Sequence, residues 1–199
     1  MTRILTLVLL VLTGCATAGG GLTVAAMETY FEEAVFGSTN MIYAWDKPIL
    51  VYVYGPLPVY EDAAGVIRLA GLTVERVQRY EDANLIIVIR PTYGRLENPN
   101  ARCETARASR SSGIIDIVVI QAEDGRCIQH EVMHSLGFRG HIYAGPNSAL
   151  RTGLQRAPLL TDADRLALRV LYDQRLRPGM TPDEARPIVR QILLEKLGG

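Results

Sequence analysis

The three histidines of this 199-residue chain all fall within twelve consecutive residues, in the run H-E-V-M-H-S-L-G-F-R-G-H that begins at His130. In a helix, residues four apart lie on one face, so His130 and His134 can bind the same metal ion. Gly137 follows three residues later, and glycine takes the left-handed conformation that ends a helix at little cost. A turn there, with Gly140 as a second permissive position, would bring His141 back to the metal.

This set of side chains has the composition of a catalytic zinc site, in which three protein ligands leave one position open for water. Zinc would lower the pKa of that water toward about 7 and polarise a scissile carbonyl. Glu131 lies beside His130 and would act as general base, later passing the proton to the leaving amine. We therefore predict Zn²⁺ bound by His130, His134 and His141, with Glu131 as the catalytic residue.

Other interpretations exist for each of these side chains. The histidines could be core or surface imidazoles without a metal, and Glu131 could be a solvated charge on the helix. Asp162 or Asp164 could replace His141 as the third ligand, because carboxylates also bind zinc. Capping of the helix that begins at Thr161 explains both aspartates better.

The N-terminus is typical of an exported protein. Arg3 precedes the apolar run 4–12 and the small residues that lead to Cys15, which is the arrangement of a secretory signal peptide and too short to span a bilayer. Leu12-Thr13-Gly14-Cys15 also resembles the bacterial lipobox, in which the cysteine is lipidated; an ordinary signal peptide with an incidental cysteine is the alternative. We expect residues 1–14 to be a signal peptide, and residues 15–26 to be the lipidated Cys15 with a flexible tether.

A lipid anchor followed by a tether suits a water-soluble domain held at a membrane. In similar lipoproteins a non-acidic residue after the cysteine, here Ala16, accompanies outer-membrane sorting, so we expect a lipid-anchored protein of the bacterial cell envelope, on the outer membrane facing the periplasm. The 21 basic and 21 acidic side chains balance, which gives no support for a nucleic-acid partner. Residues 27–199 have the length of one compact domain, which we expect to be a monomer.

Cys103 and Cys127 remain as a pair once Cys15 is assigned to the anchor. In an oxidising compartment such a pair is expected to form a disulfide. The disulfide would close a loop of about 25 residues, contribute about 3 kcal/mol to stability and fix the start of the motif helix. The alternative is that a thiolate binds the metal.

The hydrophobic pattern predicts an α+β domain, in which a small mixed sheet packs on the active-site helix and the C-terminal part is helical. The expected strands are 49–54, 84–89 and 114–120. The expected helices are 27–36, 61–79 and 126–136, followed by two that begin after Thr161 and Thr181. The polar segment 92–113 is expected to be a long surface loop.

The run H-E-V-M-H-S-L-G-F-R-G-H resembles the extended metzincin motif H-E-x-x-H-x-x-G-x-x-H. Residues 81–87 resemble the strand before the active-site helix of that family, residues 160–172 resemble its closing helix, and residues 147–150 stand where its Met-turn would be. The third histidine is one residue late, and Leu150 replaces the methionine. The resemblance implies a zincin-like fold, peptidase activity and a possible contact of Tyr143 with the oxyanion or the zinc water; a packing or surface role is the alternative for Tyr143.

The stretch L-Y-D-Q-R-L-R-P-G-M-T-P-D-E-A-R resembles a bacterial exported domain family of unassigned function, in which some members lack the His-Glu pair. We expect a zinc-dependent endopeptidase that acts on a peptide or protein substrate, with strand 114–120 as the sheet edge that pairs with it. The alternatives are a non-catalytic binding or assembly lipoprotein on the same scaffold, and hydrolysis of a non-peptide amide such as cell-wall material.

Overall fold

The computed structural model describes residues 21–89, 103–151 and 159–198. The predicted signal peptide, Cys15 and the first part of the tether lie outside these residues. Among the described residues, no helix has the length and apolar character needed to cross a membrane.

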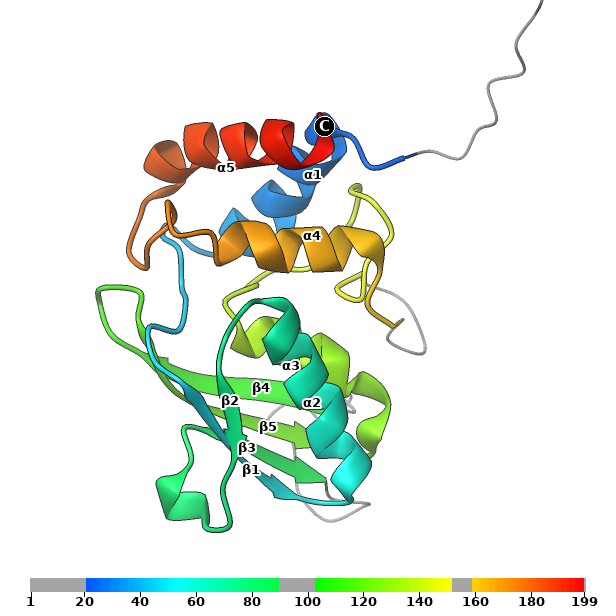
Figure 1. Cartoon of the computed structure of the whole chain (residues 1–199), viewed down its shortest axis with the longest axis vertical. Coiled ribbons are helices and arrows are strands. Elements are labelled where there is room, and N and C mark those ends of the chain that lie inside the picture. Colours follow the sequence, from blue (N-terminus) through cyan, green and yellow to red (C-terminus); the bar gives the residue numbers. More distant parts are fainter. Residues whose placement is uncertain (1–20, 90–102, 152–158, 199) are drawn as a thin grey trace, which may run out of the picture.

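A five-stranded mixed sheet forms one end of the molecule (Figure 1). Its strands are β1 (Ile49–Tyr54), β2 (Val74–Arg76), β3 (Leu85–Ile89), β4 (Cys103–Ser109) and β5 (Ile115–Ala122). Their order is β2-β1-β3-β5-β4, with β4 antiparallel to β5 and the other neighbours parallel. The three predicted strands are confirmed, since β1, β3 and β5 are the β-branched segments that form the buried centre of the sheet.

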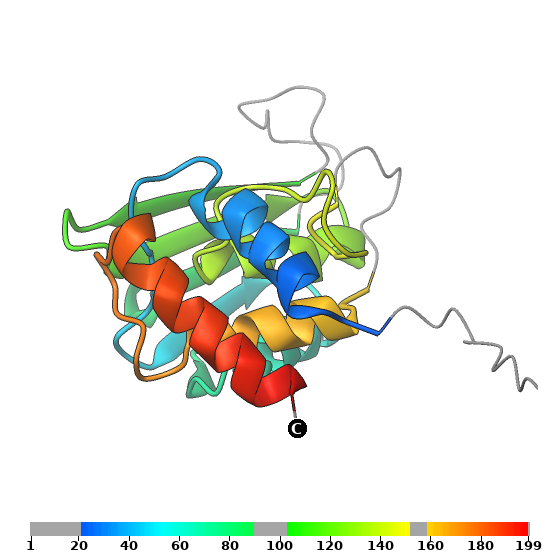
Figure 2. The same cartoon turned by 90° about the horizontal axis from the view of Figure 1, so that it is seen from above.

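Helices α2 (Leu57–Leu69) and α3 (Ile128–Ser135) pack against the sheet. The other helical elements are α1 (Val24–Phe31), the π-helix η1 (Glu32–Phe36), α4 (Asp162–Leu171) and α5 (Pro182–Leu197), besides the short 3₁₀ turns η2 (Tyr80–Asp82) and η3 (Gly125–Cys127). Figures 1 and 2 show α1, α4 and α5 gathered at the end of the molecule away from the sheet. The predicted α+β class is confirmed.

The two predicted N-terminal caps are also present. Thr161 and Asp164 form a reciprocal capping box at the start of α4, and Thr181 and Glu184 form one at the start of α5. In each box the threonine hydroxyl accepts a backbone N–H three residues on, while the acid accepts the N–H of the threonine. Both helices therefore begin where the local sequence places them.

The predicted helix 61–79 is wrong in its limits. Helix α2 begins at Leu57, directly after Pro56, and ends at Leu69. Gly71 then takes a left-handed conformation, with φ of 78°, so the chain reverses and continues as β2 instead of a further helical turn. Helix α1 in turn begins at Val24, inside the segment predicted to be tether.

The predicted loop 92–113 and the predicted sheet edge need correction together. Within that segment, Cys103–Ser109 forms β4, which pairs along β5 and leaves β4, not β5, at the edge. The sequence C-E-T-A-R-A-S contains a single β-branched residue and no strong alternation. Its pairing depends on the neighbouring strand and on contacts with α3, which local propensity does not reveal.

Candidate metal centre

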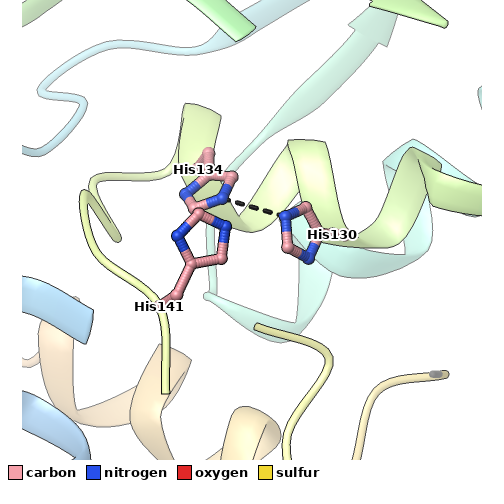
Figure 3. A group of neighbouring side chains, drawn as sticks. All are labelled: His130, His134 and His141. Carbon is pink, nitrogen blue, oxygen red and sulfur yellow. Dashed lines mark hydrogen bonds between the residues drawn. The ribbon is translucent and has the colours of Figure 1, made fainter. Parts of the chain in front are cut away.

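Three imidazoles converge where α3 meets the loop that follows it (Figure 3). His130 and His134 project from α3, and His141 reaches the same point from the loop; one ligand nitrogen of each lies within 4.8 Å of the others. The Nε2 atoms of His130 and His134 are 3.0 Å apart. Nitrogens bound to a tetrahedral zinc at about 2.0–2.1 Å are about 3.4 Å from each other, so the spacing fits one ion.

The outer nitrogens of the two helical histidines are fixed by backbone carbonyls. His130 Nδ1 lies 2.7 Å from the carbonyl oxygen of Ala149, and His134 Nδ1 lies 2.6 Å from that of Phe138. Because a carbonyl only accepts, each Nδ1 donates, and in the neutral rings each Nε2 presents a lone pair. Two lone pairs facing each other at this separation are the arrangement that a shared cation stabilises.

Burial favours the neutral, metal-binding form of His134 and His141. It lowers the pKa of His134 well below the ordinary value, and a charge on His130 lowers it further. The pKa of His141 is lowered for the same two reasons. His134 and His141 therefore give up a proton readily and keep their lone pairs available for a metal.

Helix α3 ends abruptly because three side chains bind its last carbonyls. The bonds are Arg107 Nη1 to the oxygen of His134 (2.7 Å), Trp45 Nε1 to that of Ser135 (2.9 Å) and Tyr172 Oη to that of Leu136 (2.9 Å). These donors come from β4, from the segment before β1 and from the end of α4. They satisfy the carbonyls that a helix terminus leaves free, so the chain can leave the helix next to His134.

Glycines make the return to His141 possible. Gly137 has φ of 107°, and a Cβ there would collide with the carbonyl oxygen of Tyr43. A Cβ at Gly140 would collide with the carbonyl oxygen of Glu33. Both predicted turn positions therefore require glycine, the first for its conformation and the second for close backbone approach.

Glu33 of the π-helix η1 holds the loop just beyond His141. Its carboxylate accepts the backbone N–H groups of Tyr143 (2.8 Å), Ala144 (3.0 Å) and Gly145 (3.3 Å). Burial alone would raise the pKa of Glu33, but these N–H bonds outweigh it and hold the pKa below its usual value. No local pattern in the sequence indicates this role of Glu33, because the partners are 110 residues apart or more.

Asp164 supports the His130 side of the centre. Its buried carboxylate accepts from Tyr30 Oη (2.7 Å), Ser148 Oγ (2.5 Å) and the backbone N–H of Ala149 (2.9 Å), besides the capping bonds of Thr161. Ala149 is the residue whose carbonyl fixes His130. Hydrogen bonds occupy both carboxylate oxygens of Asp164, so Asp164 is not available as a metal ligand in this arrangement. Leu150, which stands in the Met-turn position, is fully buried.

Glu131 lies at the edge of the histidine cluster and is only 5% exposed. Its Oε1 is 3.9 Å from His130 Nε2, and its Oε2 accepts a hydrogen bond of 2.6 Å from Thr105 Oγ1. Burial raises the pKa of Glu131 above its ordinary value, against the opposing effects of Thr105, His130 and Arg107. A carboxyl in this environment can exchange a proton closer to neutral pH than a solvated one.

Three alternate residues of β4, Cys103, Thr105 and Arg107, are each bonded to α3 or to the residue that caps it. Cys103 forms the predicted disulfide with Cys127, which excludes these cysteines as thiolate ligands in this state. Thr105 contacts Glu131, and Arg107 binds the helix end, where burial lowers its pKa to about 10. Residues two apart in a strand share a face, so this one face runs alongside α3.

Tyr143 lies close to His141 in sequence, but its side chain is 68% exposed. Its backbone N–H binds Glu33, and within the described part of the chain its hydroxyl makes no hydrogen bond. A role of Tyr143 toward an oxyanion or a metal-bound water stays a prediction. The structure groups three histidines as possible metal ligands, and neither Asp162 nor Asp164 joins them.

In a comparison with protein families, residues 92–191 match a family described as a protein of unknown function, DUF2927. The matched region contains β4, β5, α3, the three histidines and both cysteines of the disulfide. No curated protein matches the chain. Because the match covers half of the sequence, the chain belongs to the DUF2927 family of proteins of unknown function.

Proposed function

We propose that this protein is a zinc-dependent peptidase of the bacterial cell envelope, anchored by a lipid on Cys15. The observation that carries the proposal is the convergence of His130, His134 and His141 with ligand nitrogens within 4.8 Å, beside the buried carboxylate of Glu131. The resemblance of the histidine run to the metzincin motif agrees with this geometry.

The donor set supports zinc as the ion. Three neutral imidazoles that leave a position open are typical of catalytic zinc. The carbonyls of Ala149 and Phe138 orient two of the rings, as outer partners of metal-bound histidines usually do. A zinc ion bound there would lower the pKa of a coordinated water and polarise the substrate carbonyl.

The residues of the chain would supply the remaining steps. Glu131 would accept the proton of the attacking water and later deliver it to the nitrogen of the leaving amine. Among the described residues, β4 is the edge strand on the side of the histidines, so an extended peptide could pair with it through main-chain hydrogen bonds. The buried carboxylate of Glu131 and one open metal position would suit hydrolysis of an amide without a covalent intermediate.

The test is metal analysis and peptidase assay of the protein purified from membranes without chelators. We expect about one zinc per chain and cleavage of an unfolded protein substrate. Glu131→Gln should keep the zinc and lose turnover by roughly 10²- to 10⁴-fold. Retained activity in Glu131→Gln would rule out the proposed base.

Two other outcomes would change the proposal. A chain that binds no divalent metal would contradict the metal centre itself. Bound zinc without hydrolysis of protein or cell-wall substrates would favour the alternative, a binding or assembly lipoprotein that keeps the scaffold.

A further inference from the structure

Thr105 donates a hydrogen bond to the side chain of Glu131. Its Oγ1 lies 2.6 Å from Oε2 of Glu131 and 3.3 Å from the backbone oxygen of the same residue. A hydroxyl has one proton to donate, and the shorter contact identifies the carboxylate as the acceptor. Hydrogen bonds to an ionised group are the stronger kind.

This bond gives the two carboxylate oxygens different surroundings. Oε2 is occupied by Thr105, whereas Oε1 is 3.9 Å from His130 Nε2 and faces the histidine cluster. The last torsion of a glutamate side chain is broad and roughly two-fold, so a carboxylate without a partner samples many orientations. The hydrogen bond from Thr105 restricts the carboxylate to orientations in which Oε1 points toward the histidine cluster.

Thr105 is itself held in place from both sides. Two residues before it, Cys103 is bonded to Cys127 at the start of α3; two residues after it, Arg107 binds the carbonyl of His134 at the helix end. The Thr105 hydroxyl therefore lies on a strand face that is attached to α3 on either side of it, by the disulfide of Cys103 and by the hydrogen bond of Arg107. Side chains whose own position is locked in this way are suited to orienting a catalytic group.

We propose that Thr105 is a positioning residue, which orients the Glu131 carboxylate for proton transfer from the same edge strand that would receive the substrate. This inference rests on the proposed function of the site. It adds a requirement that the histidine motif does not contain, namely a hydroxyl on β4 opposite the glutamate.

The test compares Thr105→Val, Thr105→Ser and the unmodified zinc protein. Thr105→Val keeps a β-branched side chain but removes the hydroxyl, so kcat should fall roughly 10- to 100-fold, with KM and zinc content unchanged. Thr105→Ser restores the donor and should recover most of the activity. Thr29→Val removes a hydroxyl from α1 that bonds within its own helix, and should leave kcat unchanged.

A second measurement does not depend on turnover. Crystal structures of the zinc-bound protein should show one orientation of the Glu131 carboxylate, and those of Thr105→Val should show it displaced or spread over several. Thr105→Ala serves the same purpose if valine disturbs the packing. A carboxylate unchanged in these variants, or a kcat that Thr105→Val leaves intact, would overturn the inference.

The two proposals fail in different ways. If the unmodified protein does not hydrolyse peptides, or if Glu131→Gln remains active, the proposed function fails. If Glu131→Gln is inactive while Thr105→Val matches the unmodified protein, the proposed function stands and only the role of Thr105 is wrong.

Discussion

Replacing Asp164 by alanine should destabilise the protein by about 3–5 kcal/mol. The carboxylate accepts hydrogen bonds from Tyr30, Ser148 and Ala149, and all three donors are 0% exposed. Leaving one buried donor unsatisfied costs about 1–3 kcal/mol. The Ser148 hydroxyl is 3.3 Å from Tyr30 Oη, so these two can partly satisfy each other, and the total lies below the sum of three separate losses.

The assay is urea unfolding of the metal-free protein, with its disulfide intact, followed by circular dichroism. The matched control is Glu184→Ala, because Glu184 holds the same position in the capping box of α5 but is solvent-exposed. Its loss should be much smaller, since it removes only the cap. The zinc affinity of Asp164→Ala should also fall, because Ala149 carries the carbonyl that orients His130.

Equal losses in Asp164→Ala and Glu184→Ala would refute this reasoning. Asp164 would then stabilise the protein through its capping bonds alone. Water would be accepting the hydrogen bonds of the buried donors in Asp164→Ala. An unchanged zinc affinity would separately show that the orientation of His130 does not depend on Asp164.

Two further predictions concern the metal site. Glu33→Gln should lower zinc affinity roughly 10-fold by loosening the loop beyond His141, which titration with a competing chelator measures; an unchanged affinity would show that this loop needs no such anchor. The metal-free protein should lose stability as the pH falls below about 6.5, because burial lowers the pKa of His134 in the folded state and the unfolded chain then binds more protons. Urea titrations at about pH 7.5 and about pH 5.5 test this, and His134→Gln should reduce the difference.

Most features that were predictable from the sequence have partners within a few residues of each other; the disulfide of Cys103 and Cys127, which are 24 residues apart, was predictable instead because an oxidising compartment favours the pairing of two cysteines. His130 and His134 share a helix face, Gly137 ends that helix, and Thr161 and Thr181 begin the last two helices. Such signals depend on the geometry of one or two helical turns. The hydrophobic strands β1, β3 and β5 were predictable for a similar reason, because their runs of β-branched and other apolar residues are a local signal, and alternate residues of each run are buried.

The missed features depend on distant partners. Strand β4 has a polar sequence, and it is held by β5 and by the disulfide and hydrogen bonds that link it to α3. The pairing of β2 with β1 was hidden for the same reason, since β2 has three residues and is mostly exposed. Neither β2 nor β4 has a local hydrophobic pattern that indicates a strand, so both segments resemble loops when the sequence is considered alone.

The amino-acid sequence by itself determined which residues can bind a metal and where the chain must turn to bring them together, because helix periodicity and glycine conformation act locally. The tertiary structure decided which groups hold those residues in place: Glu33, Asp164 and Thr105 act across separations of 110, 15 and 26 residues. A hydrogen bond between distant segments forms only after the whole chain has packed, and no short stretch of sequence specifies it.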